Sequence, residues 1–390
     1  MKFKQTLFVS GLCLIVFIIG ADSFVIAPLL PAIERGFQIN LSQAAFAVSA
    51  YAISYAVGAP LLGPLGDCYP RKRLLLTGIG LFILGSWLCA VAPTIMSFYL
   101  FRAMAGIGAA LTLPNVWALI GQTFRGRQRN VIMGITMSAL SLSIVIGVPL
   151  GTWVAQLASW QSAFWLSAGV SAVALLGLSV VIPSTITVKR SITYLRSYQA
   201  VWASHQTCLT LVVTLIWMTG FYSVYTFLGT FATTQFHLNT LQVGELFSLY
   251  GACNFVASFF SGHLMTHVGA LKAVRVHGTL SALMILGMVA GRHSLVIVAV
   301  SLGGLALVQG LGVPALTTYV VNLLPAQRST VTAFNSSFLY LGLTLSSLVG
   351  GQGYARIGFS GIALVAAGML LLAVGLTVLV ERVSGDEEDG

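Results

Sequence analysis

The chain has 390 residues, of which 57% are hydrophobic and only 7% charged, and its formal net charge is +10. Soluble domains carry about 25% charged residues, so this composition excludes a water-soluble globular protein and predicts an integral membrane protein. The basic excess does not indicate nucleic-acid binding, because the cations fall in short clusters between apolar runs, as membrane topology predicts.

The five cysteines form neither a Cys-x-x-Cys pair nor a His/Cys cluster with ligand spacing. We therefore expect no disulfide framework and no metal site. Nucleotide-binding loops and Ser/His/Asp sets are also missing from the sequence, so we expect no cofactor and no enzymatic activity.

Twelve apolar segments are long enough to cross a bilayer, which takes about 20 residues. The first is too long for the apolar core of a signal peptide, and we expect an uncleaved helix there. A polar stretch at 184–206 divides the segments six and six. The expected parts are a six-helix bundle at 1–183, a cytoplasmic linker at 184–206, a second six-helix bundle at 207–382 and a disordered acidic tail at 383–390. The spans are expected near 6–31, 42–64, 73–93, 96–122, 130–153, 162–183, 207–233, 242–264, 271–291, 294–323, 330–354 and 358–380.

The positions of Lys and Arg predict the topology. With the N-terminus inside, fifteen of the nineteen basic residues fall on the cytoplasmic side and three fall outside. Cytoplasmic loops carry such an excess, so we expect both termini in the cytoplasm.

The two halves resemble each other at an offset near 199. Gly20-x-Asp22-Ser23 recurs as Gly220-x-Tyr222-Ser223, and the Arg102 segment recurs with Ala306 in place of the arginine. Six spans per half keep one orientation, so the repeat is parallel and pseudo-symmetric, with an axis along the membrane normal. The ionisable residues are concentrated in the first half, which suggests that this half performs the coupling.

Apart from charges near the ends of spans, two charges lie within the predicted spans: Asp22 in the first and Arg102 in the fourth. An aspartate at the centre of a membrane helix costs roughly 2.5–3.5 kcal/mol on insertion scales, so a functional role is favoured. Arg102 needs an acceptor, and Asp22 is the best candidate; protonation of Asp22 would weaken such a pair. The alternatives are a carboxyl that only bonds a neighbouring helix and an arginine that reaches the interface or backbone carbonyls.

The loop after the second span reads Gly63-x-Leu65-x-Asp67 and then a basic run containing Arg71 and Lys72. This pattern resembles the loop signature of the major facilitator superfamily, although Pro70 stands where that signature has glycine. The resemblance implies a conformational latch formed by Gly63, Asp67, Arg71 and Lys72. An ordinary positive-inside loop is the alternative.

Two further spans extend the resemblance. The first, with Asp22 before an apolar stretch ending in Leu-Pro, is similar to the twelve-span drug:proton antiporter branch. The fifth span carries Gly147, Pro149 and Gly151, a helix-packing motif that departs from the exporter pattern and resembles sugar- and metabolite-efflux relatives. The resemblance implies two six-helix bundles that give alternating access to a cavity near the membrane midplane.

Candidate substrate contacts are the polar and aromatic residues within spans expected to line that cavity, since aromatic rings offer area, stacking and cation–π attraction. Packing or an interfacial belt is the alternative for each aromatic residue. Glu245 is expected at the outer rim, with ligand or proton binding as the alternative. The candidates are Tyr51, Tyr55, Asn115, Trp217, Tyr222, Tyr225, Tyr250, Asn254, Gln309, Tyr319, Asn335 and Tyr340.

We therefore expect a monomeric, multi-pass transporter of a bacterial inner or plasma membrane that exports small amphipathic or apolar compounds in exchange for protons. The expected partners are a small-molecule substrate, protons and lipid, with no nucleic acid. Efflux or uptake of one metabolite, such as a sugar or nucleoside, is the alternative within transport. A non-transporting membrane receptor or enzyme is the alternative from another class.

Overall fold

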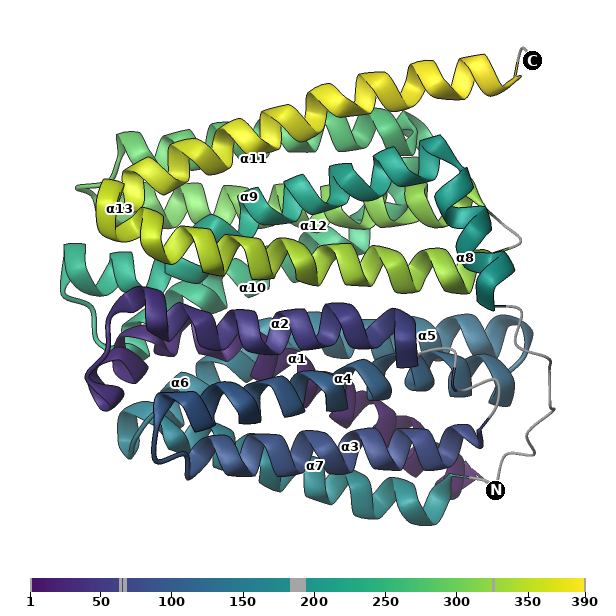
Figure 1. Ribbon diagram of the computed structural model, residues 1–390, viewed down its shortest axis with the longest axis horizontal. Helices are drawn as coiled ribbons and strands as arrows, with labels where there is room; N and C mark the ends of the chain where they lie inside the picture. The colour runs from purple at the N-terminus through teal and green to yellow at the C-terminus, as the bar shows by residue number, and fades with distance from the viewer. Residues whose placement is uncertain (1, 63–64, 66–68, 183–193, 325–326, 389–390) are drawn as a thin grey trace. The chain divides into compact units, whose positions relative to one another are not determined.

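The computed structural model describes residues 2–62, 65, 69–182, 194–324 and 327–388, and these residues form helices joined by short connections, with no strand among them (Figure 1). Eleven of the twelve expected spans coincide mainly with a single helix, and the fifth, 130–153, runs across three consecutive helical segments. Within the described residues, ten helical stretches are long and apolar enough to cross a membrane. One of these, Thr330–Glu381, is 52 residues long and carries two expected spans.

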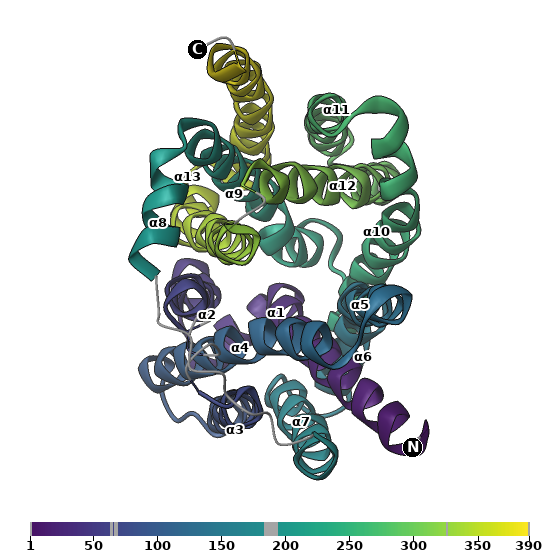
Figure 2. The same ribbon diagram turned by 90° about the vertical axis from the view of Figure 1, so that its right-hand side faces the viewer.

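The chain divides into two compact units. The first unit contains Met1–Ile192 together with Asn239–Ser248. In it α3 packs against α4 and α7, and α1 packs against α5 and α7 (Figure 2). Its helices are α1 (Lys2–Phe37), α2 (Leu41–Leu62), α3 (Arg71–Ala90), α4 (Ile95–Thr123), α5 (Gly126–Leu142), the π-helix η2 (Ser143–Gly147), α6 (Val148–Leu157) and α7 (Gln161–Val181).

The second unit contains Thr193–Leu238 and Leu249–Gly390. In it α9 packs against α13, and α11 against α12 and α13. A break at Gly358, with φ 66° and ψ −178°, separates two helices within α13. The helices are α8 (Tyr194–Ala203), α9 (His205–Phe236), α10 (Thr240–Val268), α11 (Ala270–Ala290), α12 (Leu295–Leu323) and α13 (Arg328–Glu388), with the start of α10 in the first unit.

The internal repeat extends to hydrogen bonds at helix starts. Before α2, Asn40 and Gln43 each accept the other's backbone N–H, at 2.9 and 3.1 Å. Before α10, Asn239 and Gln242 do the same, at 2.9 and 3.0 Å. These reciprocal bonds satisfy two amide groups that a helix start otherwise leaves unpaired. The two halves of the sequence repeat thus share local chemistry as well as helix order.

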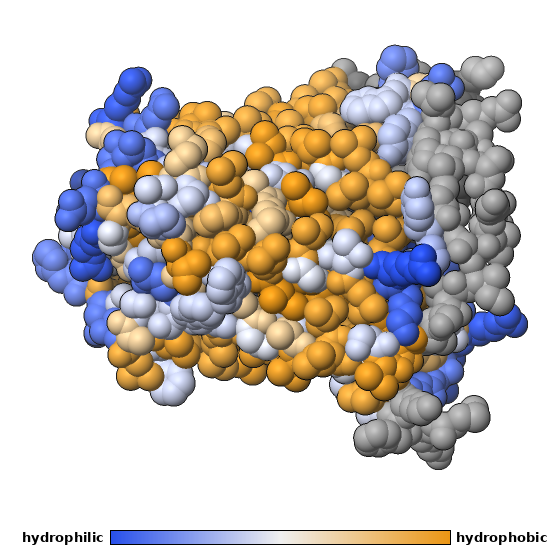
Figure 3. All heavy atoms as spheres, turned by 60° about the horizontal axis from the view of Figure 1, so that its bottom comes forward, coloured by the Kyte–Doolittle hydropathy of each residue, from blue (hydrophilic) through white to orange (hydrophobic). Residues whose placement is uncertain are grey.

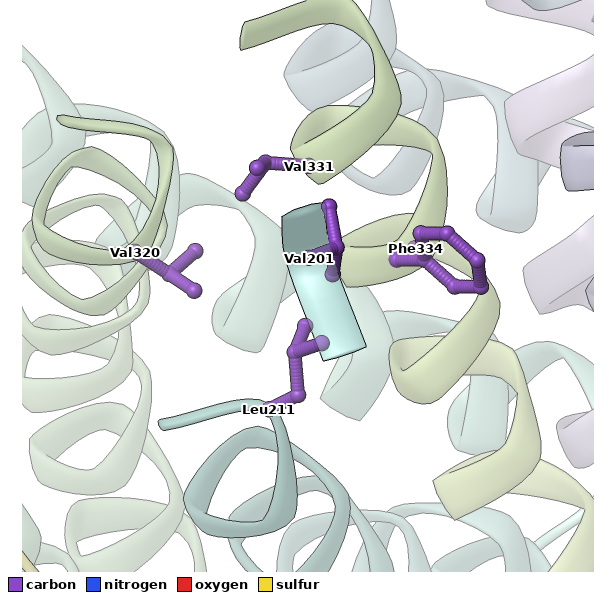
Figure 4. Close-up of a cluster of buried hydrophobic side chains, with 5 residues drawn as sticks. All are labelled: Val201, Leu211, Val320, Val331 and Phe334. Carbon is purple, nitrogen blue, oxygen red and sulfur yellow. The ribbon is translucent and has the colours of Figure 1, made fainter. Parts of the chain in front are cut away.

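The α8 helix lies in the region expected to be a linker and packs into the second unit. Val201 is buried in a cluster with residues of α9, α12 and α13 (Figure 4). Trp202 and Tyr198 contact the ring of Phe334 at centroid distances of 5.4 and 5.2 Å. The cluster consists of Val201, Leu211, Val320, Val331 and Phe334.

Large apolar side chains cover the outside of the first unit. Figure 3 shows apolar side chains across the middle of one face and hydrophilic ones gathered toward its ends. Val180 and Leu176 are 83% and 69% exposed. Such a surface suits hydrocarbon rather than water, because a soluble protein rarely exposes a large contiguous apolar patch.

Candidate functional site

Asp22 and Arg102 form an ion pair inside the first unit. Arg102 Nη1 donates to Asp22 Oδ2 at 2.6 Å, and the two side chains are 0% and 1% exposed. Asp22 lies on α1 and Arg102 on α4. A capping box between Thr94 and Ser97 starts α4, so Arg102 lies two turns into a well-anchored helix. The sequence predicted this pairing; the coupling role assigned to it stays a prediction.

Two aromatic rings cover the Arg102 guanidinium. Its Cζ atom lies 4.5 Å from the centroid of the Tyr51 ring and 5.6 Å from that of Phe164. Ser23, next to Asp22, donates a hydrogen bond from Oγ to Ile19 O at 2.8 Å. The same Oγ also lies within hydrogen-bonding distance of Tyr51 Oη, at 2.9 Å. Cation–π contacts with desolvated rings contribute roughly 2 kcal/mol, so the rings hold the guanidinium without neutralising it.

Small residues bring the fifth span against α1 on both sides of Asp22. A Cβ atom at Gly147 would lie 2.6 Å from Ala21 Cβ, and one at Gly151 would lie 2.5 Å from Val25 Cγ2. Conversely, a Cβ built at Gly20 of α1 would overlap Ser143 Oγ in the fifth span. Pro149 stands in the first turn of α6, where its missing N–H is tolerated. The predicted packing motif therefore lies directly against the helix that carries the acid.

The fifth span is interrupted at the same level by η2, the π-helix from Ser143 to Gly147. Its first and last residues are the two that meet α1 beside Asp22. Single π turns are rare and occur frequently at functional sites. Nothing in the sequence pattern signalled this segment, which the sequence placed inside an ordinary span.

The predicted latch lies only partly within the described residues, because Gly63 and Asp67 fall outside them. Lys72 Nζ donates to Ile182 O, at the end of α7, over 2.8 Å. Arg71, beside it on α3, is half-buried. A cation at a helix C-terminus complements the helix dipole, so Lys72 fixes α3 to α7.

An aromatic cluster in the second unit collects several predicted substrate contacts. Tyr225 and Tyr250 have ring centroids 5.3 Å apart, and Tyr222 lies 6.3 Å from Tyr225. Phe221, which was not among the predicted contacts, packs against all three, with ring centroids 5.0 to 5.8 Å apart. The rings pack edge to face and offset, as aromatic groups prefer. Tyr222 occupies the position equivalent to Asp22.

Other predicted substrate contacts are engaged in hydrogen bonds between helices of the second unit. Trp217 Nε1 donates to Gln309 Oε1 at 2.9 Å, and Gln309 Nε2 donates to Ser281 Oγ at 3.2 Å. Since Trp217 has a single donor and is fully buried, its polar group is used within the unit. The remaining bonds join Asn254 to Ala306 O, Tyr319 to Gln206 and Asn335 to Thr214.

In the first unit, Asn115 donates to Leu111 O of its own helix at 2.7 Å, and Tyr55 is buried on α2. Tyr340 of α13 is half-buried. Glu245 is exposed at the start of α10, in the part that belongs to the first unit.

Among the described residues no group of three His, Cys, Asp or Glu side chains could hold a metal ion.

The fold is that of a multi-pass, all-helical membrane transporter built from two repeated units. A model of the Major Facilitator Superfamily matches residues 12–300 and 231–389, and the chain therefore belongs to this superfamily. The uncharacterized MFS-type transporter YwfA of Bacillus subtilis is 28% identical over 384 residues, covering 96% of this chain and 92% of the relative.

Two further similarities are informative. The multidrug transporter protein MdtP of Bacillus subtilis is 28% identical over 173 residues, which cover 44% of this chain and 32% of that protein. The crystal structure of the human organic anion transporter MFSD10 (TETRAN) superposes with a TM-score of 0.76, at 18% identity, over 96% of this chain and 99% of that one. The structural similarity concerns the fold alone.

Proposed function

We propose that the protein is a proton-coupled exporter of small amphipathic or apolar compounds, acting in a bacterial cytoplasmic membrane by alternating access. The observation that carries the proposal is the buried Asp22–Arg102 pair. A buried ion pair contributes little net stability, because desolvation offsets the attraction between the charges. Ionisable residues inside membrane spans mark ion and proton pathways far more often than they serve packing.

In the proposed cycle, Asp22 accepts a proton at Oδ1 or Oδ2 from the outer side and becomes neutral. Arg102 then loses its counter-charge while both rings still cover it, so the charge balance at α1 and α4 changes with each protonation. Because small residues press η2 and α6 against α1 on both sides of Asp22, that change reaches the fifth span. Release of the proton inward restores the pair and permits export.

The choice of exported compounds rests on the aromatic cluster of the second unit and on the similarity to MdtP. Apolar rings with phenolic hydroxyls suit compounds that stack and accept hydrogen bonds, and they do not suit strongly anionic ones.

Transport by inverted membrane vesicles or proteoliposomes tests the proposal. With a pH gradient of the physiological sign, the wild type should accumulate dyes or drugs, and an uncoupler should abolish the accumulation. Asp22→Asn should reduce gradient-driven accumulation to the level of empty vesicles. Glu34→Gln removes a half-buried carboxylate from the same helix and should leave accumulation unchanged. Full accumulation by a correctly folded Asp22→Asn protein would contradict the proposal.

A further inference from the structure

The ion pair uses only part of its hydrogen-bonding capacity. An arginine has five N–H donors and a carboxylate two acceptor oxygens, yet a single bond joins Arg102 to Asp22. Asp22 Oδ1, Arg102 Nε and Arg102 Nη2 have no hydrogen-bond partner among the described residues. All three atoms belong to side chains that are at most 1% exposed. A buried unsatisfied polar group costs about 1–3 kcal/mol, and more when it is charged.

The surroundings limit where a further partner can bind. The rings of Tyr51 and Phe164 have their centroids 4.5 and 5.6 Å from Arg102 Cζ and occupy space beside the guanidinium. The N–H bonds of a guanidinium lie in its plane. A partner of Nε or Nη2 must therefore approach in the guanidinium plane, at the edge that Asp22 Oδ2 does not occupy.

The helix packing limits the size of that partner. A Cβ at Gly106 would overlap Tyr51 O, and one at Gly85 would lie 2.6 Å from Ala105 N. A Cβ at Gly147 would lie 2.6 Å from Ala21 Cβ on α1. Because α4 packs closely against the backbones of α2 and α3, and η2 against the small side chain of Ala21, a guest larger than a few atoms would separate the helices.

The charges limit its chemistry. An anion at this edge would face the Asp22 carboxylate, and a cation would face Arg102. A neutral molecule that accepts from one N–H and donates to a carboxylate oxygen satisfies both partners. Water does so, and buried waters typically make about three hydrogen bonds to otherwise unsatisfied groups.

We propose that a buried water site lies at the edge of the pair, where one or two water molecules accept from Arg102 Nε and Nη2 and donate to Asp22 Oδ1. This water is the immediate proton donor to Asp22. The water gives one proton to Oδ1 and takes up another from the solvent side, so that the site again holds neutral water and Asp22 becomes a neutral carboxylic acid. The site rests on the geometry of the pair and exists whether or not the pair drives transport.

A high-resolution density map of the wild-type protein in lipid nanodiscs tests the site directly. We expect a peak within hydrogen-bonding distance, about 2.6–3.2 Å, of both Asp22 Oδ1 and Arg102 Nε or Nη2. A dry site, with those atoms bonded to protein groups or the pair turned into a two-bond fork, would overturn the proposal.

Infrared spectroscopy provides a second measurement in the intact protein. Exchange of ordinary water for H₂¹⁸O should shift a narrow O–H stretching band of the bound water. Asp22→Asn should move or remove this band, because the acceptor loses its charge. Glu34→Gln and Arg275→Lys, which alter a carboxylate and an arginine elsewhere, should leave it unchanged. An identical band in Asp22→Asn would count against the site. If Asp22→Asn transports normally while the density peak is present, the proposed coupling fails and the water site stands.

Discussion

At the scale of single residues, the effect of Arg102 on the stability of the protein depends on the presence of Asp22, and the effect of Asp22 depends on Arg102. Removing one partner of a buried pair costs about 3–5 kcal/mol, whereas replacing both by apolar side chains of similar volume is often neutral or stabilising. Both side chains are fully enclosed, so this reasoning applies here with little screening by solvent.

We therefore predict that Arg102→Met destabilises the protein by about 3 kcal/mol or more, since it leaves the Asp22 carboxylate buried without its cation. The double variant Asp22→Leu with Arg102→Met should recover much of that loss while staying inactive in gradient-driven transport. Thermal unfolding in detergent measures both effects. Glu381→Gln, which breaks a partly exposed pair with Arg275 and keeps the bonds from Arg275 to Thr377, is the control and should change stability by less than about 1 kcal/mol. Equal stability of wild type and Arg102→Met would refute the prediction.

The sequence identified the charged residues of the site and named Tyr51 and Gly147 in other roles, but it missed Phe164 and Ser143. Asp22 and Arg102 stand out because a charge in an apolar run is expensive. Phe164 and Ser143 do not, because spans that are apolar all round have no periodicity to show which face meets which neighbour. For the same reason the sequence grouped Trp217 with Tyr222 as cavity residues, although Trp217 bonds Gln309 inside its unit.

At the scale of helices, glycines set how closely neighbours approach in both units. Gly106 of α4 lies against the carbonyl of Tyr51 on α2, and a Cβ at Gly310 of α12 would lie 2.6 Å from Asn254 O on α10. Tyr51 also covers Arg102. A change in the spacing of α2 and α4 therefore alters the site without touching either charge.

We predict that Gly106→Ala destabilises the protein by about 1–3 kcal/mol through overpacking and weakens coupled transport. Gly121, on the same helix, has no atom within 4 Å of a built Cβ. Gly121→Ala should be neutral or slightly stabilising, because alanine favours a helix by about 1 kcal/mol over glycine. Unfolding temperatures of the two variants, measured side by side, distinguish packing from propensity. Equal effects would show that the contact with Tyr51 is unimportant.

The π-helix η2 gives a second prediction for an element. A π turn holds one residue more than an α turn, so deleting Val145 should let the segment close as an α-helix while Gly147 and Gly151 still face α1. We expect a folded protein with lost or reduced transport, because Ser143 would leave its contact with Gly20. Deleting Ser138 from regular α5 should rotate the following residues by about 100° and destabilise the protein. Unimpaired transport without Val145 would contradict a role for η2.

At the scale of the whole molecule, the repeat preserves structural contacts and changes the chemistry. Lys72 bonds the end of α7 in the first unit. Arg275 bonds Thr377 O at 3.0 Å and Glu381 at 2.6 Å, near the end of α13, in the second. Both cations tie the third span of a unit to its sixth. The ion pair has no such counterpart, since Tyr222 and Ala306 stand at the equivalent positions, and this asymmetry is why we place coupling in the first unit.

Span number and the repeat were predictable from the sequence, because both follow from hydropathy and from residues at a fixed offset. Helix α8 was not, because its ten residues are too few and too polar to register as a span. The sequence placed the break in α13 only approximately. The break depends on the positive φ of Gly358. Glycine can adopt a positive φ but does not always do so, and its presence alone therefore does not mark a break.

The orientation of the chain decides the direction of coupling, and the distribution of basic residues predicts it. Gln38 and Arg292 should be extracellular, whereas Arg127 and Lys272 should be cytoplasmic; all four side chains are exposed. Single cysteines at these positions, in a variant whose five native cysteines are replaced, should react accordingly with a membrane-impermeant maleimide. Intact cells should label Gln38→Cys and Arg292→Cys, and Arg127→Cys and Lys272→Cys should label only after permeabilisation.

The reverse labelling pattern would place both termini outside. The inward proton gradient would then enter the proposed site from the end of the helices that carries the termini. A mixed pattern within one unit would mean a missed or extra span. The predicted pattern makes the first turns of α2, after Gln38, the outer approach to Asp22. The positively charged start of α5 near Arg127 then marks the side where the proton is released, and the inward gradient can be coupled to outward movement of the substrate.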